Sequence, residues 1–119
     1  MKFTESHEWI QKSQSKGTVG VTEYAQKELG DIVYIELPKV GSRIKAGEEV
    51  CVVESTKAAA DIYSPVSGKI LSVNEKLKEN PSLINASPEK EGWLFTIEMS
   101  SPEEYDDLLD AFEYESMIS

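Results

Sequence analysis

Apolar and polar residues alternate along several short segments of the chain. The alternation is clearest over residues 93–99, where one face carries Trp93, Phe95, Ile97 and Met99. A period of two is typical of a strand with one buried face. The same period over residues 32–37 predicts that Val33, Ile35 and Leu37 share a face.

Further strands are predicted at residues 50–54, 61–63 and 68–73. The turns between the runs are marked by Gly17, Gly41, Gly47, Gly68, Pro38 and Pro65. Many short strands with closely spaced turns indicate a mainly β fold, built as a small sandwich or barrel. At 119 residues the chain has the length of one domain with one modest core, so residues 1–119 are expected to form a single domain.

Two segments carry helix signals. Thr22 is a candidate N-cap for a helix that ends before Gly30. A second helix is predicted from Ser101, because Pro102 suits the first helical position and Glu104 completes a Ser-x-x-Glu capping box. One face of this helix is expected to bury Tyr105, Leu108, Leu109 and Phe112.

Residues 74–91 form a long polar stretch that is interrupted by Pro81 and Pro88. An irregular segment of this length is unusual within a compact domain and often has a function. One helical turn is expected after Asn80 and Pro81.

Composition narrows the classes of function. The net charge of −10 opposes binding to nucleic acids and to anionic membranes; it suits docking on basic patches of partner proteins, although acidity also simply keeps small proteins soluble. Cys51 is the only cysteine, and its place in an apolar run predicts a buried, unreactive thiol. No stretch is apolar enough to cross a bilayer and residues 1–6 lack a signal-peptide core, so a cytoplasmic location is expected.

Residues needed for several kinds of catalytic site are missing. No glycine-rich phosphate loop is present, and one histidine (His7) with one cysteine does not make a nitrogen- and sulfur-rich metal site. A nucleophilic triad would have to use His7, and no pattern places a serine or cysteine beside it. These absences disfavour a self-contained enzyme.

Residues 53–68 contain the most informative motif. Lys57 follows an apolar run, has small neighbours and precedes a second candidate strand. This arrangement predicts an amine at the tip of a hairpin, where a modifying enzyme finds it uncrowded. On the pattern alone, a solvated surface lysine is the more common outcome.

The segment around Lys57 resembles the lipoylation site of the glycine cleavage H-proteins, in which Glu-Ser-x-Lys-Ala is followed by an acidic residue and Ser-Pro. Other motifs resembling that family follow in the same order over nearly the whole chain, at residues 6–9 (Ser-His-Glu-Trp), 21–26, 29–38, 64–68, 74–75, 80–81 and 91–94. Two neighbours of the lysine depart from the common pattern. Thr56 stands where many members have valine, and Ala60 where serine or threonine is common, and either difference can affect recognition by the lipoylating enzyme.

The resemblance implies a fold, a modification and a set of partners. The fold is a lipoyl-type barrel-sandwich hybrid with a short early helix and a C-terminal amphipathic helix. The modification is lipoate in amide linkage on Lys57, which makes residues 1–119 a lipoyl-carrier domain without catalytic activity. The partners are the lipoylating enzyme, glycine decarboxylase (P-protein), aminomethyltransferase (T-protein) and dihydrolipoyl dehydrogenase (L-protein). The carrier takes an aminomethyl group from the decarboxylase to the transferase, and its dihydrolipoyl group to the dehydrogenase.

By the same resemblance, the loaded arm folds into a surface cleft that protects the labile aminomethyl group from water. Ser6, Glu8 and Asp61 match the positions that line this cleft. A cationic amine needs acceptors of this kind. The alternative is that all three are ordinary solvated turn residues.

Other functions stay open on the sequence alone. A lipoate relay, which donates lipoyl groups to 2-oxoacid dehydrogenase complexes, uses the same residues. A biotin carrier presents its lysine between methionines, and Thr56 and Ala58 do not match that pattern. An interaction module with an unmodified Lys57 is a further alternative.

Overall fold

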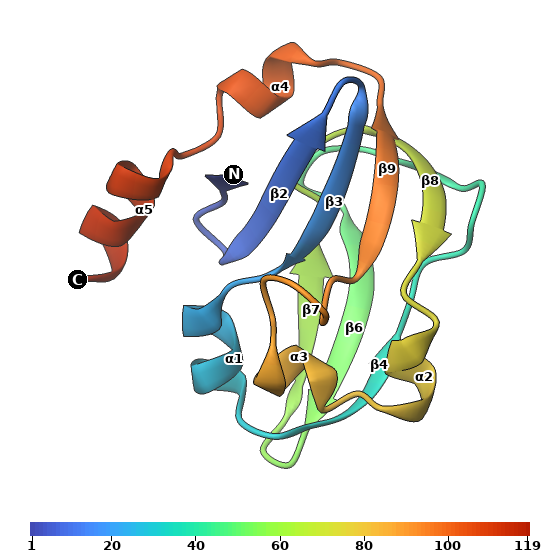
Figure 1. Ribbon diagram of the computed structural model, residues 1–119, viewed down its shortest axis with the longest axis vertical. Helices are drawn as coiled ribbons and strands as arrows, with labels where there is room; N and C mark the ends of the chain where they lie inside the picture. Colours follow the sequence, from blue (N-terminus) through green and yellow to red (C-terminus); the bar gives the residue numbers. More distant parts are fainter.

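The computed structural model describes residues 1–119 as two antiparallel β-sheets with short helices at their edges (Figure 1). The larger sheet has the strand order β1-β2-β3-β9-β8-β5, and the smaller sheet has the order β4-β6-β7. The strands are β1 (Lys2–Phe3), β2 (Glu8–Ser13), β3 (Lys16–Val21), β4 (Ile32–Glu36), β5 (Arg43–Ile44), β6 (Glu49–Ser55), β7 (Ala59–Tyr63), β8 (Gly68–Val73) and β9 (Phe95–Met99). The helices are α1 (Glu23–Leu29), α2 (Lys76–Glu79), α3 (Leu83–Ala86), α4 (Glu103–Asp106) and α5 (Ala111–Ile118).

The core lies between the two sheets, which do not close into a barrel. Ile10 and Ile97 of the larger sheet and Val53 of the smaller sheet belong to one cluster of 18 buried residues. The prediction of a mainly β fold with an early helix and a C-terminal helix is confirmed. Cys51 is also in this cluster, and burial raises the pKa of its thiol, as the sequence led us to expect. None of the helices has the length and apolar character needed to cross a membrane.

Helix α1 has the ends predicted for it. The Thr22 side chain accepts a hydrogen bond from the Ala25 N–H at 3.1 Å, which satisfies one of the free donors of the first turn. At the other end, the Gly30 N–H donates to the Gln26 carbonyl at 3.0 Å, and Gly30 itself has a φ of +82°. Ala25 is buried on the inner face of the helix.

The helix predicted from Ser101 to Phe112 is wrong in its extent. Only the single turn α4 forms, and the carboxylate of Glu104 does not close a capping box. It accepts hydrogen bonds from the N–H and the hydroxyl of Ser67, at 2.7 and 2.9 Å, and so holds the chain after β9 against the start of β8. A long-range contact has replaced the local one.

A second helix, α5, begins later than expected. Leu109 exchanges two backbone hydrogen bonds with Phe3, at 2.8 and 2.9 Å, which stops the chain from continuing as a helix. A capping box formed by Asp110 and Glu113 then starts α5. Phe112, predicted to be buried, is therefore 80% exposed, and Tyr114 is buried in its place.

Two predictions about strands are also corrected. A bulge between Ile32 and Tyr34 breaks the expected alternation, so Ile32 and Ile35 are buried and Val33 is 57% exposed. Gly17 lies inside β3 and not in a turn. A Cβ at this position would lie 2.6 Å from the Ile10 side chain, so close packing accounts for the glycine.

The polar segment of residues 74–91 is folded against the core. The helical turn expected after Pro81 is present as α3, and a second turn, α2, was not predicted. Each of the two turns buries one side chain, Leu77 in α2 and Ile84 in α3. The Asn74 side chain joins the two ends of the segment, because its amide donates to the carbonyls of Glu91 and Trp93 at 2.9 and 2.8 Å.

Candidate functional site

Lys57 lies at the tip of the hairpin formed by β6 and β7, as predicted (Figure 1). Ser55 fixes the turn: its hydroxyl accepts hydrogen bonds from the N–H groups of Lys57 and Ala58, at 3.1 and 3.2 Å. The Lys57 side chain is exposed, and the single salt bridge of the structure joins Lys78 and Glu75 elsewhere. The amine of Lys57 is therefore free on a structured turn.

The tip of the hairpin rests on the connection between α1 and β4. The Thr56 N–H donates to the Asp31 carbonyl at 3.0 Å, and Ile32 pairs with Ser55 in the smaller sheet. Next to these contacts, the Lys57 side chain packs against Gly30. The lysine is thus held in register with the end of α1.

Asn85 of α3 supports the same connection from below. Its side-chain amide donates to the Gly30 carbonyl at 2.8 Å and to the Gln26 side chain at 3.0 Å. Its side-chain oxygen accepts from the Ile32 N–H at 2.8 Å. One side chain from the polar segment therefore fixes both sides of the bend that carries the lysine hairpin.

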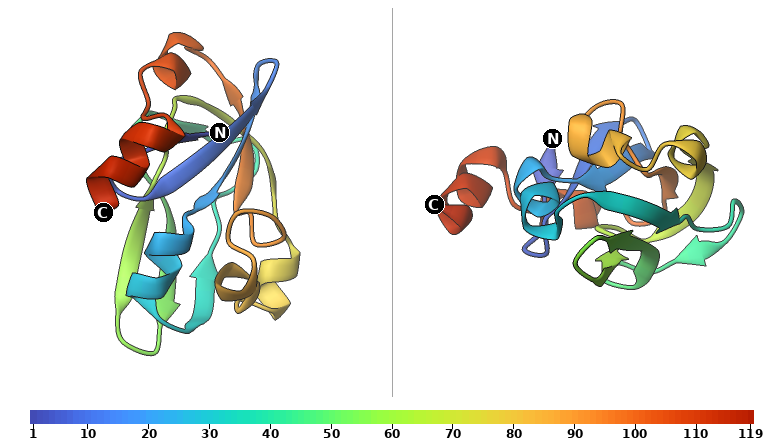
Figure 2. Two further views of the ribbon diagram at one scale, coloured as in Figure 1. Left: turned by 60° about the vertical axis from the view of Figure 1, so that its left-hand side comes forward. Right: turned by 90° about the horizontal axis from the view of Figure 1, so that it is seen from below.

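A cleft of about 150 Å³ lies between α1, β7 and the loop that precedes β2, segments that lie side by side in Figure 2. Its apolar lining is Val21, Ala25, Leu29, Ala60 and Ile62. Its polar lining is Ser6, His7, Glu28 and Asp61. The cleft combines an apolar floor with two carboxylates that are exposed to solvent.

The three residues predicted for the cleft do not occupy equivalent places. Ser6 and Asp61 line it, whereas Glu8 is 1% exposed and is not part of the lining. The Glu8 carboxylate accepts hydrogen bonds from the hydroxyls of Thr4 and Ser6 and from the Tyr63 N–H. Burial raises the pKa of Glu8, and these hydrogen bonds oppose the increase. Glu8 is therefore a support behind Ser6.

Two polar residues of the cleft were not predicted. Glu28 is an exposed position on α1, and only the placement of α1 beside β7 brings it to the cleft. His7 shares a hydrogen bond of 2.8 Å with the Tyr114 hydroxyl, which in turn shares one of 2.7 Å with Thr22. Both hydrogen bonds of Tyr114 join residues that are far apart in sequence, so no local sequence signal identifies them.

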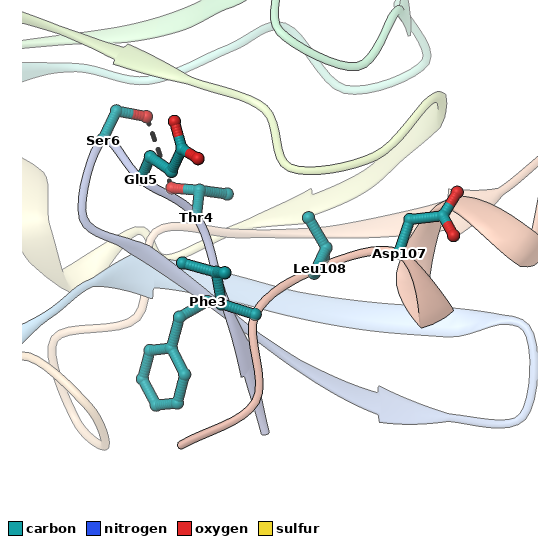
Figure 3. A pocket seen from close by; sticks show the side chains of 7 residues that line it. Phe3, Thr4, Glu5, Ser6, Asp107 and Leu108 are labelled. Carbon is teal, nitrogen blue, oxygen red and sulfur yellow. Dashed lines mark hydrogen bonds between the residues drawn. The ribbon is translucent and has the colours of Figure 1, made fainter. Parts of the chain in front are cut away.

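A larger hollow of about 530 Å³ also borders Ser6 (Figure 3). Its lining is Phe3, Thr4, Glu5, Ser6, Asp107, Leu108 and Leu109. The Ser6 hydroxyl lies 3.3 Å from that of Thr4 at this boundary. Neither Asp61 nor any residue of the lysine hairpin reaches this hollow, so the smaller cleft is the better candidate site.

Comparison with known proteins places these features in one family. The family model of the glycine cleavage H-protein matches residues 1–119. The chain is 54% identical to the glycine cleavage system H protein of Thermotoga maritima, covering 99% of this chain and 95% of that protein. It is 53% identical to the protein of the same name from Deinococcus deserti, covering 98% and 92%. The crystal structure of a glycine cleavage system H protein from Mycobacterium marinum matches with a TM-score of 0.89 and 35% identity, over 98% of this chain and 94% of that one. The chain therefore belongs to the glycine cleavage H-protein family.

Proposed function

We propose that this chain carries lipoate on the Nζ atom of Lys57 and presents it to the enzymes of glycine cleavage. Members of the family are non-catalytic carriers of that system. The observation that supports the attachment site is the free, exposed amine of Lys57 on a turn that Ser55 and Asp31 hold in place. A rigid and uncrowded amine is what a lipoylating enzyme needs.

The residues around the cleft fit a lipoyl arm. The apolar floor suits the alkyl part of the arm, and the Asp61 and Glu28 carboxylates suit a cationic amine at its end. When bound, lipoate supplies a ring disulfide that opens to accept an aminomethyl group on one sulfur. The chain positions this cargo and shields it from water.

Each predicted site residue has a distinct role in the proposal. Asp61 and the Ser6 hydroxyl contact the amine of the cargo from opposite sides of the cleft. Glu8 orients Ser6, since it accepts the Ser6 O–H at 2.6 Å and is itself fixed to β7 through Tyr63. Water exclusion by Val21, Ala25 and Ile62 strengthens these contacts.

The proposed partners follow from the same role. They are glycine decarboxylase, aminomethyltransferase and dihydrolipoyl dehydrogenase, together with a lipoylating enzyme, in the cytoplasm. Residues 1–119 act as a single lipoyl-carrier domain. The net charge of −10 supports docking on basic surfaces of these proteins and opposes binding to nucleic acids or anionic membranes. The relatives are named for glycine cleavage, which favours this role over a lipoate relay.

The test begins with intact mass after incubation with a lipoylating enzyme and lipoate. The wild type should gain one lipoyl group, mapped to Lys57. Lys57→Arg should fold and gain none, because the guanidinium stays protonated and has no free amine. Lys39→Arg, at another exposed lysine, is the matched control and should be lipoylated normally.

The second stage adds the three partner enzymes. Glycine-dependent reduction of nicotinamide should occur with the wild type and with Lys39→Arg, and should be absent with Lys57→Arg. Activity of Lys57→Arg above the level without carrier would overturn the proposal. Transfer of the lipoyl group to a 2-oxoacid dehydrogenase domain, without support of glycine cleavage, would favour the relay.

A further inference from the structure

The side chain of Lys57 lies against the face of Gly30 on which other residues carry a Cβ. A Cβ built on Gly30 would lie 3.2 Å from Lys57 Cε, 3.5 Å from Cδ and 3.7 Å from Nζ. Gly30 also has a φ of +82° and a ψ of −164°, a combination that is open almost only to glycine. The absence of a side chain at this position therefore leaves room for the lysine stem.

The backbone of Gly30 is held rigidly under the stem. Its N–H donates to the Gln26 carbonyl, and its carbonyl accepts from the Asn85 side chain at 2.8 Å. The next residue, Asp31, accepts from the Thr56 N–H of the lysine turn. Gly30 and the lysine turn are therefore fixed relative to each other on both sides of the stem.

Gly30 also lies between the lysine and the cleft. Leu29, its neighbour in sequence, forms part of the apolar floor, and Glu28 is at the rim. The Lys57 Nζ atom, the attachment point of an arm, lies just above Gly30.

We propose that Gly30 is a positioning residue, which forms the surface on which the Lys57 stem lies and over which the arm enters the cleft. The part about the arm rests on the proposed lipoylation. The part about the stem concerns the unmodified chain and does not. A Cβ at residue 30 makes the lysine stem move by a few tenths of an ångström, and so shifts the origin of the arm relative to the cleft.

The test compares Gly30→Ala with Gly47→Ala. Gly47 has a φ of +83°, close to that of Gly30, and a Cβ there meets nothing within 4 Å. Both variants thus place alanine at a positive φ, and only Gly30→Ala adds an atom beside Lys57. Unfolding midpoints of the two variants measure the strain that each substitution introduces.

The first measurement uses unmodified protein with ¹³C-labelled lysine. The Cε signal of Lys57 should show restricted motion and a distinct shift in the wild type and in Gly47→Ala. Gly30→Ala should lose both features. An unchanged Lys57 signal in a folded Gly30→Ala variant would overturn the proposal, whatever the state of lipoylation.

The second measurement uses lipoylated protein loaded with the aminomethyl group and freed of the decarboxylase. Release of formaldehyde should be roughly three- to tenfold faster from Gly30→Ala than from Gly47→Ala, equivalent to about 0.6–1.4 kcal/mol. Equal rates in lipoylated, loaded proteins would contradict the passage over Gly30. Failure of the wild type to accept lipoate would instead contradict only the proposed function.

If Gly30→Ala does not fold, a second variant, Asn85→Ala, tests the proposal. Asn85→Ala frees the Gly30 carbonyl without adding any atom to the surface under the stem. It should increase the mobility of Lys57 Cε in the unmodified protein. Asn80→Ala, at an exposed asparagine whose side chain hydrogen-bonds only with Ser82, is its control and should leave that signal unchanged. Identical signals in both asparagine variants and the wild type would overturn the proposal.

Discussion

The side-chain carboxylate of Glu8 accepts a hydrogen bond from the backbone N–H of Tyr63 at 3.1 Å, across 55 positions of sequence. This contact joins the loop that carries Ser6 to the strand that carries Asp61. Because Ser6 also donates to Glu8, the two walls of the cleft are connected through one buried carboxylate. The spacing between Ser6 and Asp61 therefore depends on Glu8, although Glu8 does not line the cleft.

Asp61→Asn should weaken protection of the loaded arm. The change removes the negative charge and keeps the shape, so lipoylation of Lys57 should be unaffected. A hydrogen bond to a charged group contributes about 1.5–3 kcal/mol, and solvent exposure of Asp61 favours the lower end. Formaldehyde release from the loaded form should then be about tenfold faster. Glu36→Gln, at an exposed carboxylate outside the cleft, is the control; equal rates for the two variants would count against a role for Asp61.

Glu8→Gln should change how stability depends on pH. Burial raises the pKa of Glu8 from its ordinary value of 4.5, so the folded protein binds a proton at Glu8 more readily than the unfolded chain does. The stability that this preference contributes is complete below the ordinary pKa and is lost as the pH rises through the raised pKa. Glutamine stays neutral, and its amide can donate to the Thr4 and Ser6 hydroxyls while its oxygen accepts from Tyr63.

The stability of Glu8→Gln should therefore increase relative to the wild type between pH 4 and pH 7, by about 1.4 kcal/mol for each pH unit between the two pKa values of Glu8. Urea denaturation at the two pH values measures this. A difference that does not grow with pH would show that the buried carboxylate carries no such penalty.

Asn85→Ala should destabilise the protein by about 1–3 kcal/mol, because the N–H of the buried Ile32 and the Gly30 carbonyl both lose a partner. Hydrogen exchange at the Ile32 amide should become faster. Asn80→Ala should have an effect within about 0.5 kcal/mol, since Asn80 is exposed. Equal urea midpoints for the two variants would argue against the support role of Asn85.

Tyr114→Phe should destabilise the protein by about 1–2 kcal/mol, because it removes the hydroxyl shared with His7 and Thr22 and keeps the ring stacked on Phe3. Phe112→Ser should change stability by no more than about 0.5 kcal/mol, since Phe112 is 80% exposed. Thermal unfolding of both variants tests this order. A larger loss of stability for Phe112→Ser than for Tyr114→Phe would mean that Phe112 is buried, as the sequence pattern predicts.

Local signals predicted local structure well. Both ends of helix α1 are predicted correctly, because its N-cap, Thr22, and its C-cap, Gly30, bond to residues of the helix itself. The capping box predicted at Ser101 is wrong because Glu104 bonds to Ser67 instead. Of the predicted apolar face, Tyr105, Leu108 and Leu109 do pack against the core, and only Phe112 is exposed, because the pairing of Leu109 with Phe3 interrupts the helix. Both competing partners are far away in sequence, where no helix pattern records them.

For the candidate site, too, local features are predicted from the sequence and long-range contacts are not. Lys57 was placed at its hairpin tip because the two strands are adjacent in sequence. The burial of Glu8, the presence of Glu28 at the cleft and the support by Asn85 required the packing of α1, β7 and α3. These contacts join segments that only the tertiary fold brings together.

The attachment of the C-terminal segment to Phe3 and His7 affects the order in which the site is completed during synthesis. His7 and Tyr114 are 107 positions apart, so a chain that is still being translated lacks the partner of His7 until Tyr114 has left the ribosome. The pairing of β6 with β7, on which Lys57 lies, joins strands that are neighbours in sequence and does not have to wait for this step. The hairpin that carries Lys57 can therefore form before the loop that carries Ser6 and His7 gains its contact with α5.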